Sequence, residues 1–183
     1  SHHRTMVVEV MGRHAGWIAT FSGIAGGADV ILVPELLIDI EETCALLKKR
    51  HDRGRTFSIV VVAEGAKMKN SDVTQDQSLD EFGHVKLGGS GDYLAKEIEK
   101  RTGYETRVSV LGHIQRGGTP TAFDRILGTR FGVKAVELIE KKQFGQMVSL
   151  QGTKIVALPL EKGVEKLKTI DMDLYDIAKV FFG

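Results

Sequence analysis

The run from Phe57 to Ala63 constrains the fold of this chain more than any other segment. Its residues, FSIVVVA, are almost continuously apolar. A strand that is apolar on both of its faces is typical of a parallel sheet covered by helices on both sides. Glu64 and Gly65 follow directly, so the apolar run ends in a polar turn. The run therefore predicts a central, fully buried strand within an α/β fold.

Apolar segments that are typical of strands alternate along the chain with segments of helical periodicity. Further strands are expected at 6–10, 30–33 and 108–111, and helices at 14–27, 40–50, 93–102 and 121–141. Weaker signals predict strands at 147–149 and 154–158 and a helix at 174–182. This alternation predicts a mostly parallel sheet with helices on both faces.

Two of the expected helices have apolar residues on one face. In the segment 14–27 these residues are Trp17, Ile18, Phe21, Ile24 and Ala25. In the segment 121–141 they are expected to form a buried stripe of Phe123, Ile126, Leu127, Phe131, Ala135 and Leu138. The polar, glycine-rich segment 67–91 shows little periodicity, so we expect a long loop or a hairpin there and assign it no function.

The composition is ordinary for a globular protein, and we expect residues 1–183 to form one domain. The net charge of +1 gives no overall attraction to nucleic acid or to an anionic membrane surface, and no apolar run approaches the roughly 18 residues of a membrane span. The single cysteine, Cys44, fits a reducing cytoplasm. Because the chain enters a strand within a few residues of Ser1, we expect a fragment of a longer polypeptide.

A basic, glycine-rich loop follows the strand expected at 108–111. The segment 109–119, SVLGHIQRGGT, carries an imidazole, an amide and a guanidinium before two glycines. Thr119 is expected to cap the next helix, with Pro120 at the first helical position. Backbone N–H groups, a helix dipole and an arginine together favour an anion. The alternative is a surface loop with an incidental arginine.

Three of the expected strands are each followed by a short segment that carries a charged or polar side chain. These segments are Met11-Gly12-Arg13, Glu64-Gly65 and the segment from His113 to Arg116. Ligands of parallel α/β sheets bind beyond the carboxyl ends of the strands, so these groups are expected to converge. The imidazole and the guanidinium groups suit a phosphate dianion, and a carboxylate suits a sugar hydroxyl. The set therefore predicts a site for a phosphorylated polyol, against the alternative of ordinary surface ion pairs.

Other site classes find no support in the sequence. There is no Gly-x-x-x-x-Gly-Lys-Ser/Thr phosphate loop. The glycines between Gly23 and Gly27 end a helix rather than begin one, so they are not a dinucleotide fingerprint. His2, His3, His14 and His51 show no metal-ligand spacing with cysteines or acids. We therefore expect no metal site in this chain, and no residue in it is an obvious general base or magnesium ligand.

Several ordered motifs closely resemble the phosphofructokinase family, from Ser1 to about Lys142. They are Val7–Arg13, Ala25–Gly27, Val62–Gly65, Glu105–Arg107, Leu111–Gly118 and Phe123–Leu127. The resemblance implies a two-lobed α/β enzyme of glycolysis that phosphorylates the 1-hydroxyl of fructose 6-phosphate. This chain resembles the carboxyl-terminal lobe that binds fructose 6-phosphate. The lobe that holds Mg²⁺ and the phosphoryl donor, which is ATP or pyrophosphate, would lie upstream.

The resemblance also implies a role for each residue that follows a strand. His113 and Arg116 would contact the phosphate of the sugar. Glu64 would hold a sugar hydroxyl, and Met11 and Gly12 would pack and hydrogen-bond against the sugar.

Three arginines complete the implied active site. Arg13 would reach the transferring phosphoryl group and would be the one catalytic residue in this chain. Arg4 and Arg107 match arginines that, in the family, reach into the site of a neighbouring subunit. The resemblance thus implies a homo-oligomer, a tetramer or a dimer with shared active sites, and a fragment that is inactive by itself.

Two further questions stay open at the level of sequence. Asp29, Arg53 and Arg55 match an effector-binding site of regulated bacterial members, where the pattern is Glu and two Lys, so allosteric control is a candidate property. ATP-dependent phosphofructokinase is the leading function, and a pyrophosphate-dependent phosphotransferase is the alternative. A non-catalytic module that binds a sugar phosphate is the alternative of another class.

Overall fold

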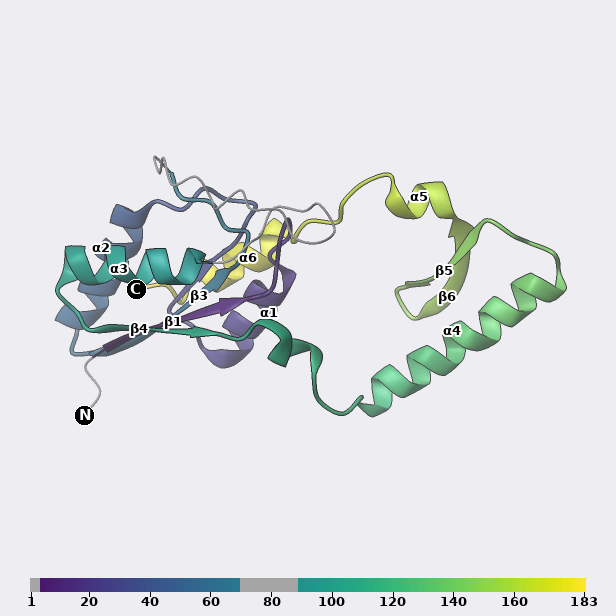
Figure 1. Ribbon diagram of the computed structural model, residues 1–183, viewed down its shortest axis with the longest axis horizontal. Helices are drawn as coiled ribbons and strands as arrows, with labels where there is room; N and C mark the ends of the chain where they lie inside the picture. The colour runs from purple at the N-terminus through teal and green to yellow at the C-terminus, as the bar shows by residue number, and fades with distance from the viewer. Residues whose placement is uncertain (1–3, 70–88) are drawn as a thin grey trace. The chain divides into compact units, whose positions relative to one another are not determined.

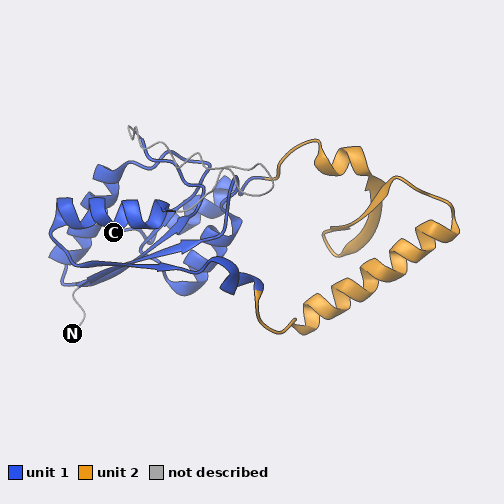
Figure 2. Cartoon of the chain, viewed as in Figure 1, with its two compact units in different colours: residues 1–116, 169–183 blue, residues 117–168 orange. Residues whose placement is uncertain are grey.

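The computed structural model describes residues 4–69 and 89–183. The chain divides into two compact units, Ser1–Arg116 with Thr169–Gly183, and Gly117–Lys168 (Figure 2). Each unit is described by itself below. In the described part of the chain, no helix combines the length and the apolar character that crossing a membrane requires.

The first unit is built on a four-stranded parallel sheet in the order β2-β3-β1-β4 (Figure 1). The strands are β1 (Arg4–Val10), β2 (Val30–Leu32), β3 (Phe57–Ala63) and β4 (Thr106–Val110). Strand β3 has the predicted bounds, and its neighbours β1 and β2 leave it without an open edge. The predicted α/β class with a parallel sheet is therefore confirmed.

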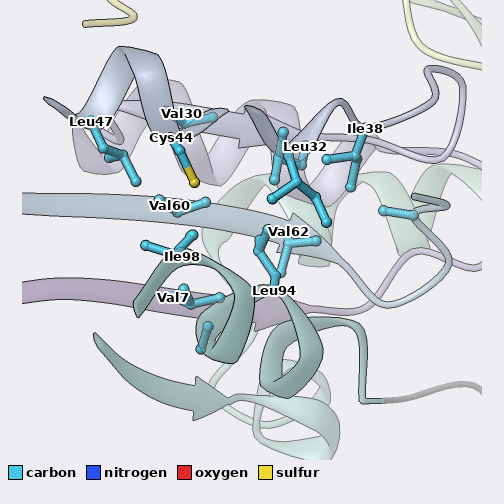
Figure 3. Close-up of a cluster of buried hydrophobic side chains, with 13 residues drawn as sticks. Val7, Val30, Leu32, Ile38, Cys44, Leu47, Val60, Val62, Leu94 and Ile98 are labelled. Atoms are coloured by element: carbon cyan, nitrogen blue, oxygen red, sulfur yellow. The ribbon is translucent and has the colours of Figure 1, made fainter. Parts of the chain in front are cut away.

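Helices cover both faces of this sheet, and each face has its own apolar core. On one face, α2 (Ile40–Asp52) and α3 (Ser90–Thr102) pack on the sheet around Val7, Val60 and Leu94 (Figure 3). On the other face, α1 (Trp17–Gly26) and α6 (Met172–Lys179) enclose residues that include Ile31 and Tyr175. Alternate residues of β1, β2 and β3 supply the two cores, as the strand period of two requires.

Helix α1 packs on the sheet through small residues and not through the apolar face that the sequence suggests. Ala19, Thr20 and Gly23 are buried, whereas Ile18 and Phe21 are 41% and 58% exposed. A Cβ atom at Gly23 would lie 2.5 Å from the Cδ1 atom of Ile31. Because the helix axis lies so close to β2, the contacting face has room only for small side chains.

The second unit contains one long helix, one short helix and a hairpin. Helix α4 (Ala122–Glu140) leads into β5 (Gln146–Gln151) and β6 (Lys154–Pro159), which pair antiparallel, and α5 (Leu160–Val164) follows. Both weak strand predictions are confirmed. Helix α5 is not among the elements that the sequence predicts.

The predicted buried stripe on α4 is confirmed only in part, because three of its six members are half-buried and two are exposed. Leu138 is buried, but Phe123 and Ile126 are 65% and 61% exposed. Helix α4 has 19 residues and is therefore about 28 Å long. Strands β5 and β6 have six residues each and extend about 20 Å. The hairpin is therefore too short to cover the whole apolar face of the helix.

The cap of α4 also differs from the prediction. Thr121, and not Thr119, is the N-cap residue, and Pro120 precedes the helix instead of occupying its first position. The Thr121 Oγ1 atom accepts the Asp124 N–H at 3.3 Å, and the Asp124 carboxylate accepts the Thr121 N–H at 2.8 Å. This reciprocal capping box needs an acidic or amide residue three positions after the cap, which Thr119 lacks.

Candidate functional site

Three loops leave the carboxyl ends of adjacent parallel strands at the same edge of the sheet. Val10 of β1 pairs with Ala63 of β3, and Glu9 pairs with Val110 of β4, so the three strands end at the same level. The segments that follow are residues 11–13, residues 64–65 and the short 3₁₀ helix η1 (Gly112–Arg116). The sheet register thus brings the predicted segments together.

The loop after β1 is hydrogen-bonded to the loop after β3. The Glu64 Oε1 atom accepts the Gly12 N–H at 3.2 Å, and the Gly65 N–H donates to the Gly12 carbonyl at 3.0 Å. The Glu64 N–H continues the ladder by donating to the Val10 carbonyl at 2.9 Å. Among the described residues, only the Oε1 atom of the Glu64 carboxylate accepts a hydrogen bond.

The loop after β1 is also tied to η1, through an amide side chain. The Gln115 Oε1 atom accepts the Met11 N–H at 2.7 Å. The Leu111 N–H donates to the Glu9 carbonyl at 3.0 Å, which fixes the chain immediately before η1. Met11 and Gly12 therefore receive side-chain acceptors from two different strand ends.

Two glycines allow these loops to approach one another. Gly12 has a φ angle of +151°, a conformation that side chains rarely adopt, and a Cβ atom there would lie 2.9 Å from the Ala15 carbonyl oxygen. A Cβ atom at Gly65 would lie 1.9 Å from the Arg13 carbonyl oxygen. Any side chain at Gly65 would thus push apart the loops that follow β1 and β3.

The charged groups at this edge have different degrees of exposure. Arg13 and Glu64 are half-buried, whereas His113 and Arg116 are exposed. Among residues 4–69 and 89–183, no hydrogen bond or ion pair engages the side chains of Arg13, His113 or Arg116. Basic groups without a partner beside a half-buried carboxylate can bind an anionic ester that also carries hydroxyls.

Sequence reasoning missed a second layer of polar residues behind these loops. Glu9 is buried in β1, and its Oε2 atom accepts the Gly91 N–H at 2.7 Å. The Ser90 Oγ atom donates to the Glu64 carbonyl at 2.9 Å. The position of Glu9 inside the apolar run VVEV could have indicated a buried polar residue. No local sequence pattern distinguishes Ser90.

The described residues do not form a metal centre. No group of three or more His, Cys, Asp or Glu side chains in residues 4–69 and 89–183 is placed to hold a metal ion. The site at the carboxyl edge therefore supplies backbone N–H groups, basic side chains and one accessible carboxylate.

Arg4 and Arg107 lie at the opposite, amino-terminal edge of the sheet. Arg4 begins β1, and Arg107 is the second residue of β4. Both contact Glu105, with Arg4 Nη2 at 3.5 Å and Arg107 Nε at 2.9 Å from carboxylate oxygens. The hydrogen bond from Arg107 and the charge of Arg4 lower the pKa of Glu105. The structure does not bring these two arginines to the edge that carries His113.

The three candidate effector residues also lie towards the amino ends of the strands. Asp29 is buried, pairs with Arg50 at 2.8 Å and accepts the Ile59 N–H at 2.8 Å. Arg53 donates to the Gly183 carbonyl at 2.8 Å, and Arg55 is exposed.

A cavity of about 400 Å³ adjoins Asp29. Its lining is formed by Ile24, Gly27, Ala28, Asp29, Ile31, Arg50, Ala178 and Phe181. Neither Arg53 nor Arg55 lines it, and the Asp29 carboxylate is already neutralised by Arg50. The described geometry therefore gives Asp29 a structural role.

Comparison with known proteins gives one consistent result. The family model described as phosphofructokinase matches residues 1–139. A relative from Streptomyces coelicolor, named pyrophosphate–fructose 6-phosphate 1-phosphotransferase, is 56% identical over 184 residues, covering 100% of this chain and 54% of the relative. A relative from Mycobacterium leprae, named ATP-dependent 6-phosphofructokinase, is 53% identical over 184 residues with the same coverage.

Solved structures agree with these sequence matches. The crystal structure of Pichia pastoris phosphofructokinase in the T-state has a TM-score of 0.71 and 35% sequence identity, covering 99% of this chain and 19% of that one. The chain spans about half the length of the two named relatives. The relatives use different phosphoryl donors by name, so similarity alone does not select a donor.

Proposed function

Because this chain belongs to the phosphofructokinase family, we propose that it is the sugar-phosphate-binding lobe of a larger phosphotransferase. The whole enzyme would transfer a phosphoryl group to the 1-hydroxyl of fructose 6-phosphate and form fructose 1,6-bisphosphate, a step of glycolysis. Residues 1–183 would act as one functional lobe. The observation that supports this proposal best is the convergence of three strand ends, joined by the bonds from Gly12 to Glu64 and from Met11 to Gln115.

The phosphate of the sugar would bind to His113 and Arg116. Both side chains are exposed at the carboxyl edge and have no partner among the described residues. A charge-assisted hydrogen bond to a phosphate oxygen contributes about 1.5–3 kcal/mol. Two such groups on η1 would hold the phosphate near the loop after β1, to which Gln115 of η1 is hydrogen-bonded.

The sugar itself would lie against Met11, Gly12 and Glu64. Glu64 already accepts the Gly12 N–H through Oε1, which fixes the orientation of its carboxylate. Its second oxygen would accept a hydrogen bond from a sugar hydroxyl. A carboxylate that is held in this way discriminates between hydroxyl stereoisomers, because an inverted hydroxyl leaves it unpaired.

Arg13 would stabilise the transferring phosphoryl group. It follows the same strand as Met11 and Gly12, and the close packing of its carbonyl against Gly65 fixes its backbone. Positive charge at this position would stabilise the negative charge on the oxygens of the transition state. The described residues offer no ligand cluster for the expected Mg²⁺, which would be held by the lobe that binds the phosphoryl donor.

We further propose that Arg4 and Arg107 serve the active site of a neighbouring subunit. Their position at the amino-terminal edge of the sheet makes a role at their own carboxyl edge unworkable. The enzyme would be a tetramer or a dimer with shared sites.

Its expected location in the cytoplasm fits Cys44, a free and buried thiol. An allosteric effector at Asp29, Arg53 and Arg55 would have to compete with Arg50 for the Asp29 carboxylate.

A steady-state assay of the full-length protein tests the proposal. Fructose 6-phosphate would be supplied with Mg²⁺ and either ATP or pyrophosphate, and fructose 1,6-bisphosphate would be measured. We expect turnover with one of the two donors. Binding of fructose 6-phosphate without turnover with either donor would favour the non-catalytic module, and absence of binding would refute the proposal.

A further inference from the structure

Glu9 is a buried carboxylate that the proposed reaction does not use. It is 3% exposed and lies in β1 on the face that α3 covers. No ion pair between described residues engages it. Burial raises the pKa of Glu9, and the nearby carboxylates of Glu64 and Asp92 raise it further, while the Gly91 N–H lowers it. A buried carboxylate without a cation is unfavourable unless hydrogen bonds compensate it.

The hydrogen bond that Glu9 makes is directed at the first turn of α3. Its Oε2 atom accepts the N–H of Gly91, the second residue of that helix, at 2.7 Å. The approach is close because Gly91 has no side chain: a Cβ atom there would lie 3.0 Å from Oε2 and 3.1 Å from the Cβ atom of Glu9. The helix begins with Gly89 as its N-cap residue and without a side-chain cap, so Glu9 satisfies one of its unpaired N–H groups.

The same turn of α3 holds the backbone of Glu64. Ser90, which precedes Gly91, donates its hydroxyl to the Glu64 carbonyl at 2.9 Å. Glu64 in turn accepts the Gly12 N–H at 3.2 Å. Three hydrogen bonds, which are joined by the adjacent residues Ser90 and Gly91 and by Glu64 itself, therefore connect Glu9 with Gly12.

We propose that Glu9 is a positioning residue, which fixes the first turn of α3 and, through Ser90, the Glu64 carboxylate at the sugar end of the site. This inference rests on the function proposed above, and it concerns the residues that hold Glu64 of that site in position. Glu9 does not touch the sugar, since it is buried behind the loops. Its effect is confined to the position of Glu64, so binding of fructose 6-phosphate depends on it and binding of the phosphoryl donor does not.

Four variants of the full-length protein test this role. Glu9→Leu removes the acceptor, and Glu9→Gln keeps an oxygen that can accept the Gly91 N–H. Ser90→Ala removes only the bond to Glu64. Leu47→Ala opens the same apolar core from α2 without touching these hydrogen bonds, so it controls for lost stability. The readouts are the KM for fructose 6-phosphate, the KM for the donor, kcat and the melting temperature.

We expect Glu9→Leu to raise the KM for fructose 6-phosphate about tenfold and to leave the KM for the donor within about twofold. Glu9→Gln should stay within about twofold of wild type, and Ser90→Ala should raise the KM for fructose 6-phosphate about three- to fivefold. Leu47→Ala should lower the melting temperature with an unchanged KM for fructose 6-phosphate.

The opposite pattern overturns the inference. Equal rises of both KM values in Glu9→Leu, or a lowered melting temperature with unchanged KM values, would reduce Glu9 to a structural residue. If Glu9→Leu does not fold, Ser90→Ala decides, and an unchanged KM for fructose 6-phosphate in that variant refutes the role. A wild-type protein that does not bind fructose 6-phosphate would refute the proposed function itself, which is a separate and recognisable result.

Discussion

The amide oxygen of Gln115 accepts the backbone N–H of Met11 at 2.7 Å, between residues 104 positions apart in the sequence. This bond joins η1 to the loop after β1, so it relates the proposed phosphate-binding residues to the proposed sugar-binding residues. Neither partner lies in a regular strand or α-helix, and the relative position of the two loops therefore depends on few contacts.

Replacing Gln115 by Met is expected to weaken the binding of fructose 6-phosphate. Methionine keeps the length of the side chain and removes the acceptor, which leaves the Met11 N–H unpaired in a half-buried position. We expect the KM for fructose 6-phosphate to rise about five- to tenfold, corresponding to roughly 1 kcal/mol, with little change in melting temperature. Gln143→Met, at an exposed position in the second unit, is the matched control. An unchanged KM in Gln115→Met would show that η1 is positioned by other contacts.

Replacing Arg13 by Ala is expected to lower kcat rather than to raise the KM for fructose 6-phosphate. The reason is that Arg13 would contact the transferring phosphoryl group, and this contact would be stronger in the transition state than in the ground state. A loss of about 100-fold in kcat corresponds to about 2.7 kcal/mol. Steady-state kinetics of the full-length protein measure both constants. A kcat equal to that of wild type would remove Arg13 from the chemistry.

The glycine after Glu64 offers a steric test of the loop arrangement. Gly65→Ala would place a Cβ atom 1.9 Å from the Arg13 carbonyl oxygen, so the two loops must separate. We expect a loss of stability of about 2 kcal/mol or more and a raised KM for fructose 6-phosphate.

The matched control for that variant is Gly26→Ala, near the end of α1. No atom lies within 4 Å of a Cβ atom built at Gly26, and alanine favours a helix by up to about 1 kcal/mol. Chemical denaturation of both variants measures the difference. Equal stability of Gly65→Ala and wild type would contradict the close approach of the loops.

Tyr175 provides a test of how α6 is attached to the sheet. Its hydroxyl donates to the Ile31 carbonyl at 2.8 Å, and burial raises the pKa of Tyr175 to about 12. Since the folded state holds this proton above the ordinary tyrosine pKa of about 10, the stabilisation is complete below pH 10 and is lost as the pH rises towards about 12.

Tyr175→Phe should therefore lower the free energy of unfolding by about 1–2 kcal/mol at neutral pH. Between about pH 10 and pH 12 the wild type should lose stability more steeply than the variant does. Urea denaturation at several pH values measures both effects. Parallel pH profiles of the two proteins would show that the phenol does not titrate differently in the folded state.

The parts of this fold that were predictable depend on local patterns. The sequence predicts both ends of strand β3 correctly, because an apolar run between polar turns is compatible with few structures other than a buried strand. The convergence of the three loops followed from the parallel sheet, since parallel strands end at the same edge. The hydrogen-bond partners at that edge cannot be predicted from the parallel sheet. Gln115 lies in a predicted loop, but no local sequence pattern pairs it with Met11.

The errors have physical causes that a single sequence does not reveal. The buried face of α1 is set by the distance to Ile31, which favours Gly23 over the larger residues nearby. The sequence predicts the cap of α4 two residues too early, because both Thr119-Pro120 and Thr121 are suitable helix starts and Asp124 completes a capping box only with Thr121. Phe123 is exposed although it belongs to an apolar stripe. Such a stripe shows which face of a helix favours burial, but it does not identify the element that buries it.

The central claim is that residues from three strand ends jointly bind one phosphate ester, and Arg116 tests it most directly. The dissociation constant of fructose 6-phosphate would be measured for the full-length protein, for Arg116→Ala and for Arg130→Ala, an exposed arginine that donates to the Thr153 carbonyl in the second unit. We predict that Arg116→Ala weakens binding about 10- to 100-fold and that Arg130→Ala leaves it unchanged. Unchanged binding in Arg116→Ala would contradict the claim.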